Sequence, residues 1–154
     1  MTAGHAMYAE PTERQRWMAV LARATHEELE AFASAHELPS WDIVKGPETG
    51  VVMVEARAGG TGRRFNLGEA TVTRAAVRLA TGEVGLSYAL GRDTRRAELA
   101  AVIDGLLQHA GWRRRVENGL IAPLAARQRQ MREAASRKAA ATKVDFFTLQ
   151  RGDG

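Results

Sequence analysis

The chain contains no cysteine among its 154 residues. This absence excludes disulfides, thiolate nucleophiles, thiolate zinc sites and any iron-sulfur cluster held by cysteines of this chain. Histidine is also sparse, and its spacing never places two imidazoles on one face as HxH or HExxH would. The four are His5, His26, His36 and His109. We therefore expect no metal site.

Long apolar runs are missing as well. No stretch approaches the roughly 18 apolar residues of a membrane-spanning helix, and the N-terminal MTAGHAMYAE lacks the basic and apolar segments of a secretory signal. The composition, 45% hydrophobic and 26% charged, is that of an ordinary soluble domain. We expect a cytoplasmic protein that has no membrane partner.

The charge is unevenly distributed along the chain. Residues 1–91 hold 9 Lys/Arg and 11 Asp/Glu, whereas residues 92–154 hold 13 and 7, so the first part carries −2 and the second +6. A basic half attracts nucleotides, nucleic acid or an acidic protein surface, and it is equally typical of a solvated helix face. Only 6% of residues are aromatic, and no stacking platform accompanies the basic half, so we expect no nucleic-acid partner.

The periodicity predicts an α+β fold: an antiparallel meander of about four strands packed with helices. Thr12 with Gln15, and Thr25 with Glu28, have capping-box spacing, which predicts helices over 13–24 and 26–36. The predicted strands lie at 41–44, 51–57, 65–80 and 84–90, with GPETG at 46–50 as a turn. An apolar stripe predicts a further helix over 94–110, closed by Gly111 as a left-handed cap.

The carboxy-terminal segment is poor in large apolar residues. A long helix after LIAPL at 120–124 offers only Leu124 and Met131 among Ala, Arg, Lys and Gln, too thin a face to build a core. We expect it to dock on another protein, although the tail could instead fold back over the sheet of this chain. The expected organisation is a flexible N-terminus (1–11), an α+β domain (12–119) and a helical arm and tail (120–154). The docking residues predicted on the arm are Leu124, Met131, Val144, Phe146, Phe147 and Arg151.

A glycine-rich stretch, AGGTGRR at 58–64, raises the question of phosphate binding. It lacks both the Lys-Ser/Thr of a Walker loop and the GxGxxG spacing, and a hairpin connection explains its glycines equally well. In the functional interpretation its arginines, joined by two more on the next strand, bind phosphate or carboxylate oxygens in bidentate fashion. The candidate substrate-binding residues are Gly59, Gly60, Gly62, Arg63, Arg64, Arg74 and Arg78. We identify no catalytic residue.

Eight strings between Trp17 and Asp153 resemble, in register, the PhnG family, the G subunits of the bacterial carbon-phosphorus lyase system. They are WMAVLA (17–22), ETG (48–50), GGTGRRF (59–65), GEATVTRAAVRL (68–79), GRD (91–93), AELAAVIDGL (97–106), LIAPL (120–124) and VDFFTLQRGD (144–153).

The resemblance implies a component of a cytoplasmic complex that takes phosphorus from alkylphosphonates. It implies H, I and J subunits as partners, the I-type subunit as the main contact, and association of the ATP-binding K and L subunits. ATP would be a substrate of the complex, which releases adenine and forms a ribose 1-phosphonate 5-triphosphate, and the chain would have no cofactor of its own. The displacement chemistry is assigned to the I subunit, so we expect a subunit that is not catalytic alone.

Overall fold

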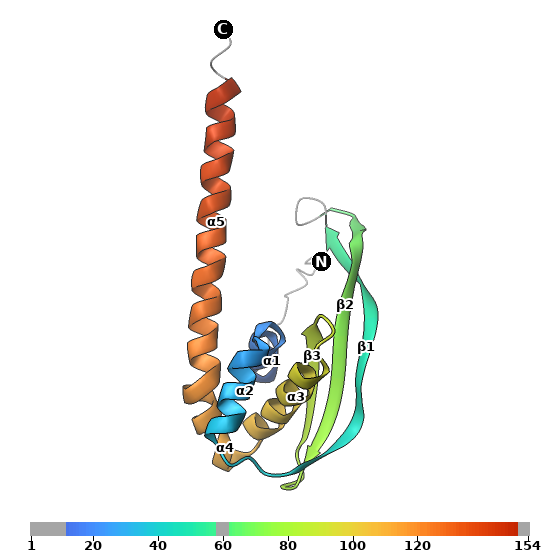
Figure 1. The fold of residues 1–154 in the computed structure, drawn as a ribbon. Helices are drawn as coiled ribbons and strands as arrows, with labels where there is room; N and C mark the ends of the chain where they lie inside the picture. The colour runs from blue at the N-terminus through green and yellow to red at the C-terminus, as the bar shows by residue number, and fades with distance from the viewer. Residues whose placement is uncertain (1–11, 58–61, 151–154) are drawn as a thin grey trace, which may run out of the picture.

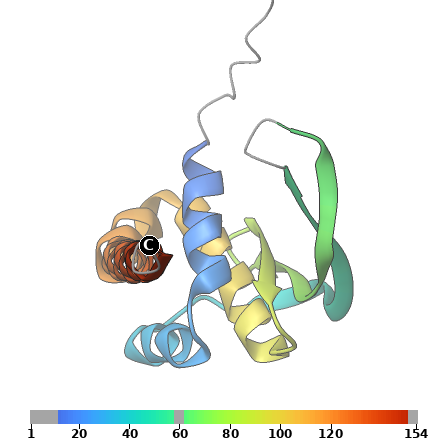
Figure 2. The same ribbon diagram turned by 90° about the horizontal axis from the view of Figure 1, so that it is seen from above.

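The computed structural model describes residues 12–57 and 62–150, with side chains for 12–56 and 62–142. A three-stranded antiparallel sheet in the order β1-β2-β3 forms one layer; helices α1 and α3 pack against it, and α2 packs against α3 (Figures 1 and 2). The predicted α+β class is therefore confirmed. The strands are β1 (Trp41–Arg57), β2 (Arg64–Leu79) and β3 (Val84–Leu90). The packed helices are α1 (Glu13–Arg23), α2 (His26–Ala35) and α3 (Thr94–Gln108).

The prediction of about four strands was wrong, because residues 41–57 form one strand rather than two. The GPETG segment does not reverse the chain; it is a bulge within β1, with register shifts on both sides of Lys45. Gly46 takes a φ of 72°, and Pro47 fits because β1 is an edge strand with no second neighbour to hydrogen-bond. Both halves of β1 therefore pair with the same partner, β2.

Helices α1 and α2 each begin at a capping box, at Thr12 and Thr25. In each box the threonine hydroxyl accepts from the third helical N–H, and the side chain at that position accepts from the threonine N–H. Two backbone donors are satisfied at each helix start. These local bonds fix where the helices begin before any tertiary contact forms.

Helix α3 is the centre of the core, with ten of its residues buried. It crosses β3 at Gly85, where a Cβ would meet the Ala101 carbonyl oxygen at 1.8 Å. Only glycine permits this approach of strand to helix. The core also includes Trp17, Leu29 and Phe32, the inner residues of β2, and apolar residues from the end of α4 to the start of α5, namely Val116, Leu120, Ile121 and Leu124.

The predicted glycine cap at 111 was also wrong. Helix α3 ends two residues earlier, at Gln108, and the next residue, His109, is both its C-cap and the N-cap of α4 (Ala110–Val116). The His109 Nδ1 accepts from the Gly111 N–H at 3.0 Å, so Gly111 lies inside the first turn of a new helix. A side-chain cap thus replaces the left-handed glycine that the pattern predicted.

After α4 the chain passes through a π-helical turn, η2 (Glu117–Ile121), into α5 (Ala122–Gln150), which extends far beyond the other helices (Figure 1). Leu124 and Gln128 are buried at its start, whereas every residue from 129 to 142 is exposed. Within the described residues, no helix has the length and hydropathy needed to span a bilayer.

Candidate subunit interface

The predicted substrate-binding residues are spread along the β1–β2 hairpin. Gly59 and Gly60 lie outside the described residues, while Gly62 and Arg63 are exposed at its end. Arg64 begins β2, and its guanidinium lies 3.7 Å from the Glu55 carboxylate. The described members, Gly62, Arg63 and Arg64, lie at the start of β2, opposite the end of β1.

Arg74 and Arg78 lie on the exposed face of β2, as their four-residue spacing predicts. Ten residues of strand separate Arg64 from Arg74, which corresponds to roughly 30 Å. Directly across the ladder, Arg74 faces Glu48 and Arg78 faces Asp42. The predicted set therefore does not converge on one anion, and carboxylates stand opposite two of its members.

The same exposed face is rich in apolar side chains. Twelve of the thirteen large apolar residues that the structure shows as exposed lie on the three strands. On β3 the buried and exposed residues alternate strictly, and the exposed set consists of Val84, Leu86, Tyr88 and Leu90. Tyr88 and Leu90 are 56% and 58% exposed. Helices cover the inner face of the sheet, and this outer face is uncovered in the described chain.

The end of the hairpin is apolar on both sides. Val51, Val52, Met53 and Val54 follow one another on β1, and all four are between 38% and 59% exposed. Because successive strand residues point to opposite faces, two of them lie on each side of the ribbon. Phe65 and Leu67 on β2 add to the same end, at 46% and 63% exposure. Continuous apolar strands of this kind are typical of strands buried on both faces.

The predicted docking residues on the C-terminal helix have different environments. Leu124 is only 7% exposed and belongs to the core of this chain, whereas Met131 is 63% exposed. The side chains of Val144, Phe146 and Phe147 lie outside the described part, as does Arg151 entirely. The docking role of α5 stays a prediction. Of the predicted docking residues whose side chains the structure describes, Met131 is the exposed one.

Sequence reasoning missed the large apolar surface of the hairpin. The signal was present in the run VVMV at 51–54, which is uniform rather than alternating. A half-buried edge strand with solvent on one face alternates, so a uniform run indicates a second covering surface.

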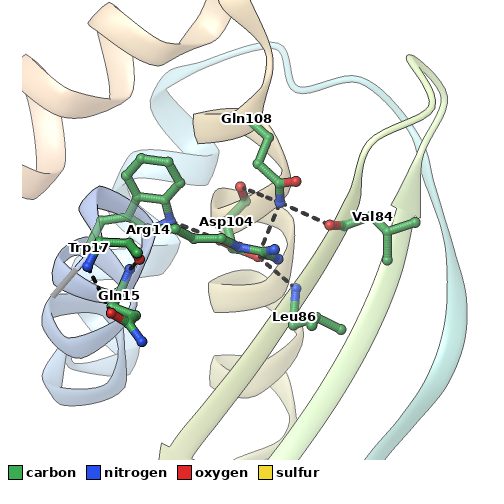
Figure 3. Close-up of polar contacts among 8 residues, drawn as sticks. Arg14, Gln15, Trp17, Val84, Leu86, Asp104 and Gln108 are labelled. Carbon is green, nitrogen blue, oxygen red and sulfur yellow. Dashed lines mark hydrogen bonds and ion pairs between the residues drawn. The ribbon is translucent and has the colours of Figure 1, made fainter. Parts of the chain in front are cut away.

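Sequence reasoning also missed Asp104, a buried carboxylate at the centre of the fold (Figure 3). Its oxygens accept from the Trp17 indole at 2.8 Å, from the Leu86 N–H at 2.9 Å and from the Arg14 guanidinium at 3.2 and 2.8 Å. The Gln108 amide lies 3.3 Å from one of them. The hydrogen bond to Asp104 raises the pKa of Arg14. With its acceptor sites occupied, this carboxylate joins α1, α3 and β3 and is not a site for a ligand.

A second polar cluster joins α2 to the start of α3. Asp93 caps α3 by accepting from the Arg96 N–H at 2.9 Å, and His26 Nδ1 lies 2.7 Å from the same carboxylate. The Arg96 hydrogen bond is the main reason that the pKa of Asp93 is lowered, and His26 adds to it. Nearby, Arg95 donates to Glu30 at 2.8 Å and lowers the pKa of that carboxyl. These contacts fix the orientation of α2 relative to α3, and none of them involves a residue of the outer sheet face.

A small α+β core, a sheet face without cover and a hairpin apolar on both sides together define a component of a larger assembly. The family model described as phosphonate metabolism protein PhnG matches residues 12–152. The chain belongs to this family. It is also 49% identical over 142 residues to the "Alpha-D-ribose 1-methylphosphonate 5-triphosphate synthase subunit PhnG" of Rhizobium meliloti (strain 1021), covering 92% of this chain and 90% of that protein.

Proposed function

We propose that this chain is a subunit of alpha-D-ribose 1-methylphosphonate 5-triphosphate synthase in phosphonate metabolism, and that it supports assembly rather than catalysing the reaction. The outer face of the sheet and the β1–β2 hairpin dock onto a partner subunit. The observation that carries the proposal is the twelve exposed large apolar residues on the strands. Each such side chain contributes roughly 1.5–3 kcal/mol when it is fully buried.

The partners are the H, I and J subunits of the same cytoplasmic complex, with the I-type subunit as the main contact and the ATP-binding K and L subunits associated. ATP is a substrate of the complex, and this chain has no cofactor of its own. The geometry supports an extended contact, because a two-stranded ribbon with apolar residues on both faces needs cover on both sides. One large partner that contacts both faces of the hairpin provides that cover.

The C-terminal half of α5 supplies a second contact. A described stretch of fourteen consecutive residues, 129–142, has every residue exposed. An isolated helix of this length is marginal in water even when it is rich in alanine, and most helices in proteins are stabilised by packing. Contact with a partner through Met131 and the following tail stabilises it.

Co-purification with a tagged I-type subunit tests the docking surface. Val52→Glu on the hairpin and Tyr88→Glu on the outer sheet each place a charge at the interface, so we expect at least a tenfold loss of bound chain. Both sites are exposed in the described chain, at 41% and 56%, so far-UV circular dichroism should be unchanged. Glu27→Gln, at an exposed position on α2 away from the sheet, is the control and should co-purify normally.

The contribution of α5 is tested separately. Removing residues 129–154 keeps the buried positions Leu124 and Gln128 and deletes only the extended part. We expect weaker co-purification, and Met131→Glu should show part of the same loss. Full co-purification of the truncated chain contradicts docking by α5, whereas full co-purification of both strand variants contradicts docking by the sheet.

A further inference from the structure

A basic groove is lined by residues of α1 and of the start of α5. Figure 2 shows α1 between α5 and the sheet, so the groove is on the side of α1 that faces away from the sheet. Its volume is about 440 Å³, within the range of small-molecule sites. Every charged residue that lines it is an arginine. These are Arg16 and Arg23 from α1 and Arg129 and Arg132 from α5, joined by the amides of Gln15 and Gln128.

Helix geometry explains how these arginines meet. Arg16 and Arg23 are seven residues apart, which is two turns on one face of α1 and roughly 10 Å of rise. Arg129 and Arg132 are three residues apart and share a face of α5. The buried Gln128 donates to the Val20 carbonyl oxygen at 3.0 Å and so fixes the two helices against each other. This hydrogen bond holds the two walls of the groove together at Gln128.

Neighbouring arginines of the same helices are neutralised within the chain. Arg14 pairs with Asp104, and Arg127 pairs with Glu28. Within the described residues, Arg23, Arg129 and Arg132 form no ion pair with a carboxylate. Clustered guanidinium groups repel one another, and a bound anion relieves that repulsion while accepting bidentate hydrogen bonds.

We propose that this groove binds the triphosphate group of a nucleotide or of a ribose 5-triphosphate. A triphosphate carries about four negative charges along a short chain, arginines from both helices line the groove, and phosphate oxygens accept hydrogen bonds from arginine in bidentate fashion. This inference rests on the proposed function, which supplies triphosphates as substrate and product. The alternative occupant, an acidic segment of a partner subunit, is separated by the experiment.

Isothermal titration of the full chain with inorganic triphosphate, ATP and orthophosphate is the direct test. We expect triphosphate and ATP to bind with similar affinity and orthophosphate much more weakly. Arg23→Gln should weaken triphosphate binding several-fold, and Arg129→Gln with Arg132→Gln at least tenfold. Arg137→Gln, an exposed arginine on the same helix outside the groove, is the matched control and should stay within twofold.

The assembled complex provides a second readout. The double variant should raise the KM for ATP in adenine release, and because it keeps Met131 and the strand surface it should co-purify with partner subunits more fully than the chain that lacks residues 129–154. Unchanged triphosphate binding and unchanged KM overturn the inference, as does an equal loss in Arg137→Gln, which would show only diffuse charge. Loss of partner subunits in the double variant with triphosphate binding intact also overturns it, because the groove would then be a protein contact. None of these outcomes depends on Val52→Glu or Tyr88→Glu, which test the proposed function alone.

Discussion

Replacing Asp104 by alanine should destabilise the chain more than any polar substitution on its surface. The carboxylate is fully buried, and it is the acceptor for the Trp17 indole and the Leu86 N–H. Without it, both donors stay buried with no partner, and each costs about 1–3 kcal/mol. Arg14 suffers less, because its side chain is 40% exposed and regains water.

The expected loss is therefore about 3–5 kcal/mol in the free energy of unfolding, which is also the range for breaking a buried pair by removing one partner. For a chain of this size that corresponds to a melting temperature lower by roughly 6–20 °C. Asp104→Asn should lose less, since the amide keeps one acceptor oxygen in the same volume. Urea unfolding followed by far-UV circular dichroism measures both.

Glu133→Ala, at an exposed position on α5, is the control and should change the stability by no more than about 0.5 kcal/mol. A loss below about 1 kcal/mol for Asp104→Ala, with an unchanged slope in urea, would refute the reasoning. It would mean that water enters the junction of α1, α3 and β3 and accepts the hydrogen bonds of Trp17 and Leu86 in place of the carboxylate.

Two further predictions concern the joints of the core. Gly85→Ala should lower the free energy of unfolding by about 3 kcal/mol or more, because the added methyl overlaps the Ala101 carbonyl. Gly50→Ala is the control and should change it by no more than about 1 kcal/mol, since a Cβ there meets nothing within 4 Å. Equal urea midpoints for the two variants would contradict this prediction. Asp93→Ala should cost about 0.5–2 kcal/mol at pH 7 through the lost helix cap. Because the pKa of Asp93 is lowered in the folded chain, the stabilisation by its charge is complete above about pH 4 and is lost as the pH falls through the folded pKa. The stability gap between wild type and Asp93→Ala should therefore narrow in acid, and a gap that is constant down to pH 2 would show that the charge of Asp93 does not stabilise the fold.

Local patterns located several elements directly. Thr12 and Thr25 mark helix starts because a capping box is closed by residues only three apart. The alternation of β3 appears in the burial pattern as the period of a strand requires. The single apolar stripe predicted for α3 was too narrow, because every residue from 99 to 107 is buried and the helix is covered on all its faces. The face shared by Arg74 and Arg78 followed in the same way from strand geometry.

The errors arose where other hydrogen bonds of the folded chain replaced the turn or cap that the local pattern predicted. GPETG has the composition of a turn, yet pairing with β2 on both sides keeps β1 continuous through a bulge. Gly111 has the position of a helix cap, yet the side chain of His109 starts a second helix there. In both cases a local signal was genuine but weaker than the hydrogen bonds that the folded chain supplied.

The sequence alone determined the α+β class, the absence of cysteine chemistry and the resemblance to a family of assembly components, since these depend on composition and short-range order. Tertiary structure alone decided that Asp104 meets Trp17 and Leu86, that the hairpin stands with apolar residues on both faces, and that arginines of α1 and α5 line one groove. Trp17 meets Asp104 across 87 residues of sequence, and Gln128 meets Val20 across 108. Helix packing and strand register bring such segments together, and neither is encoded in local periodicity.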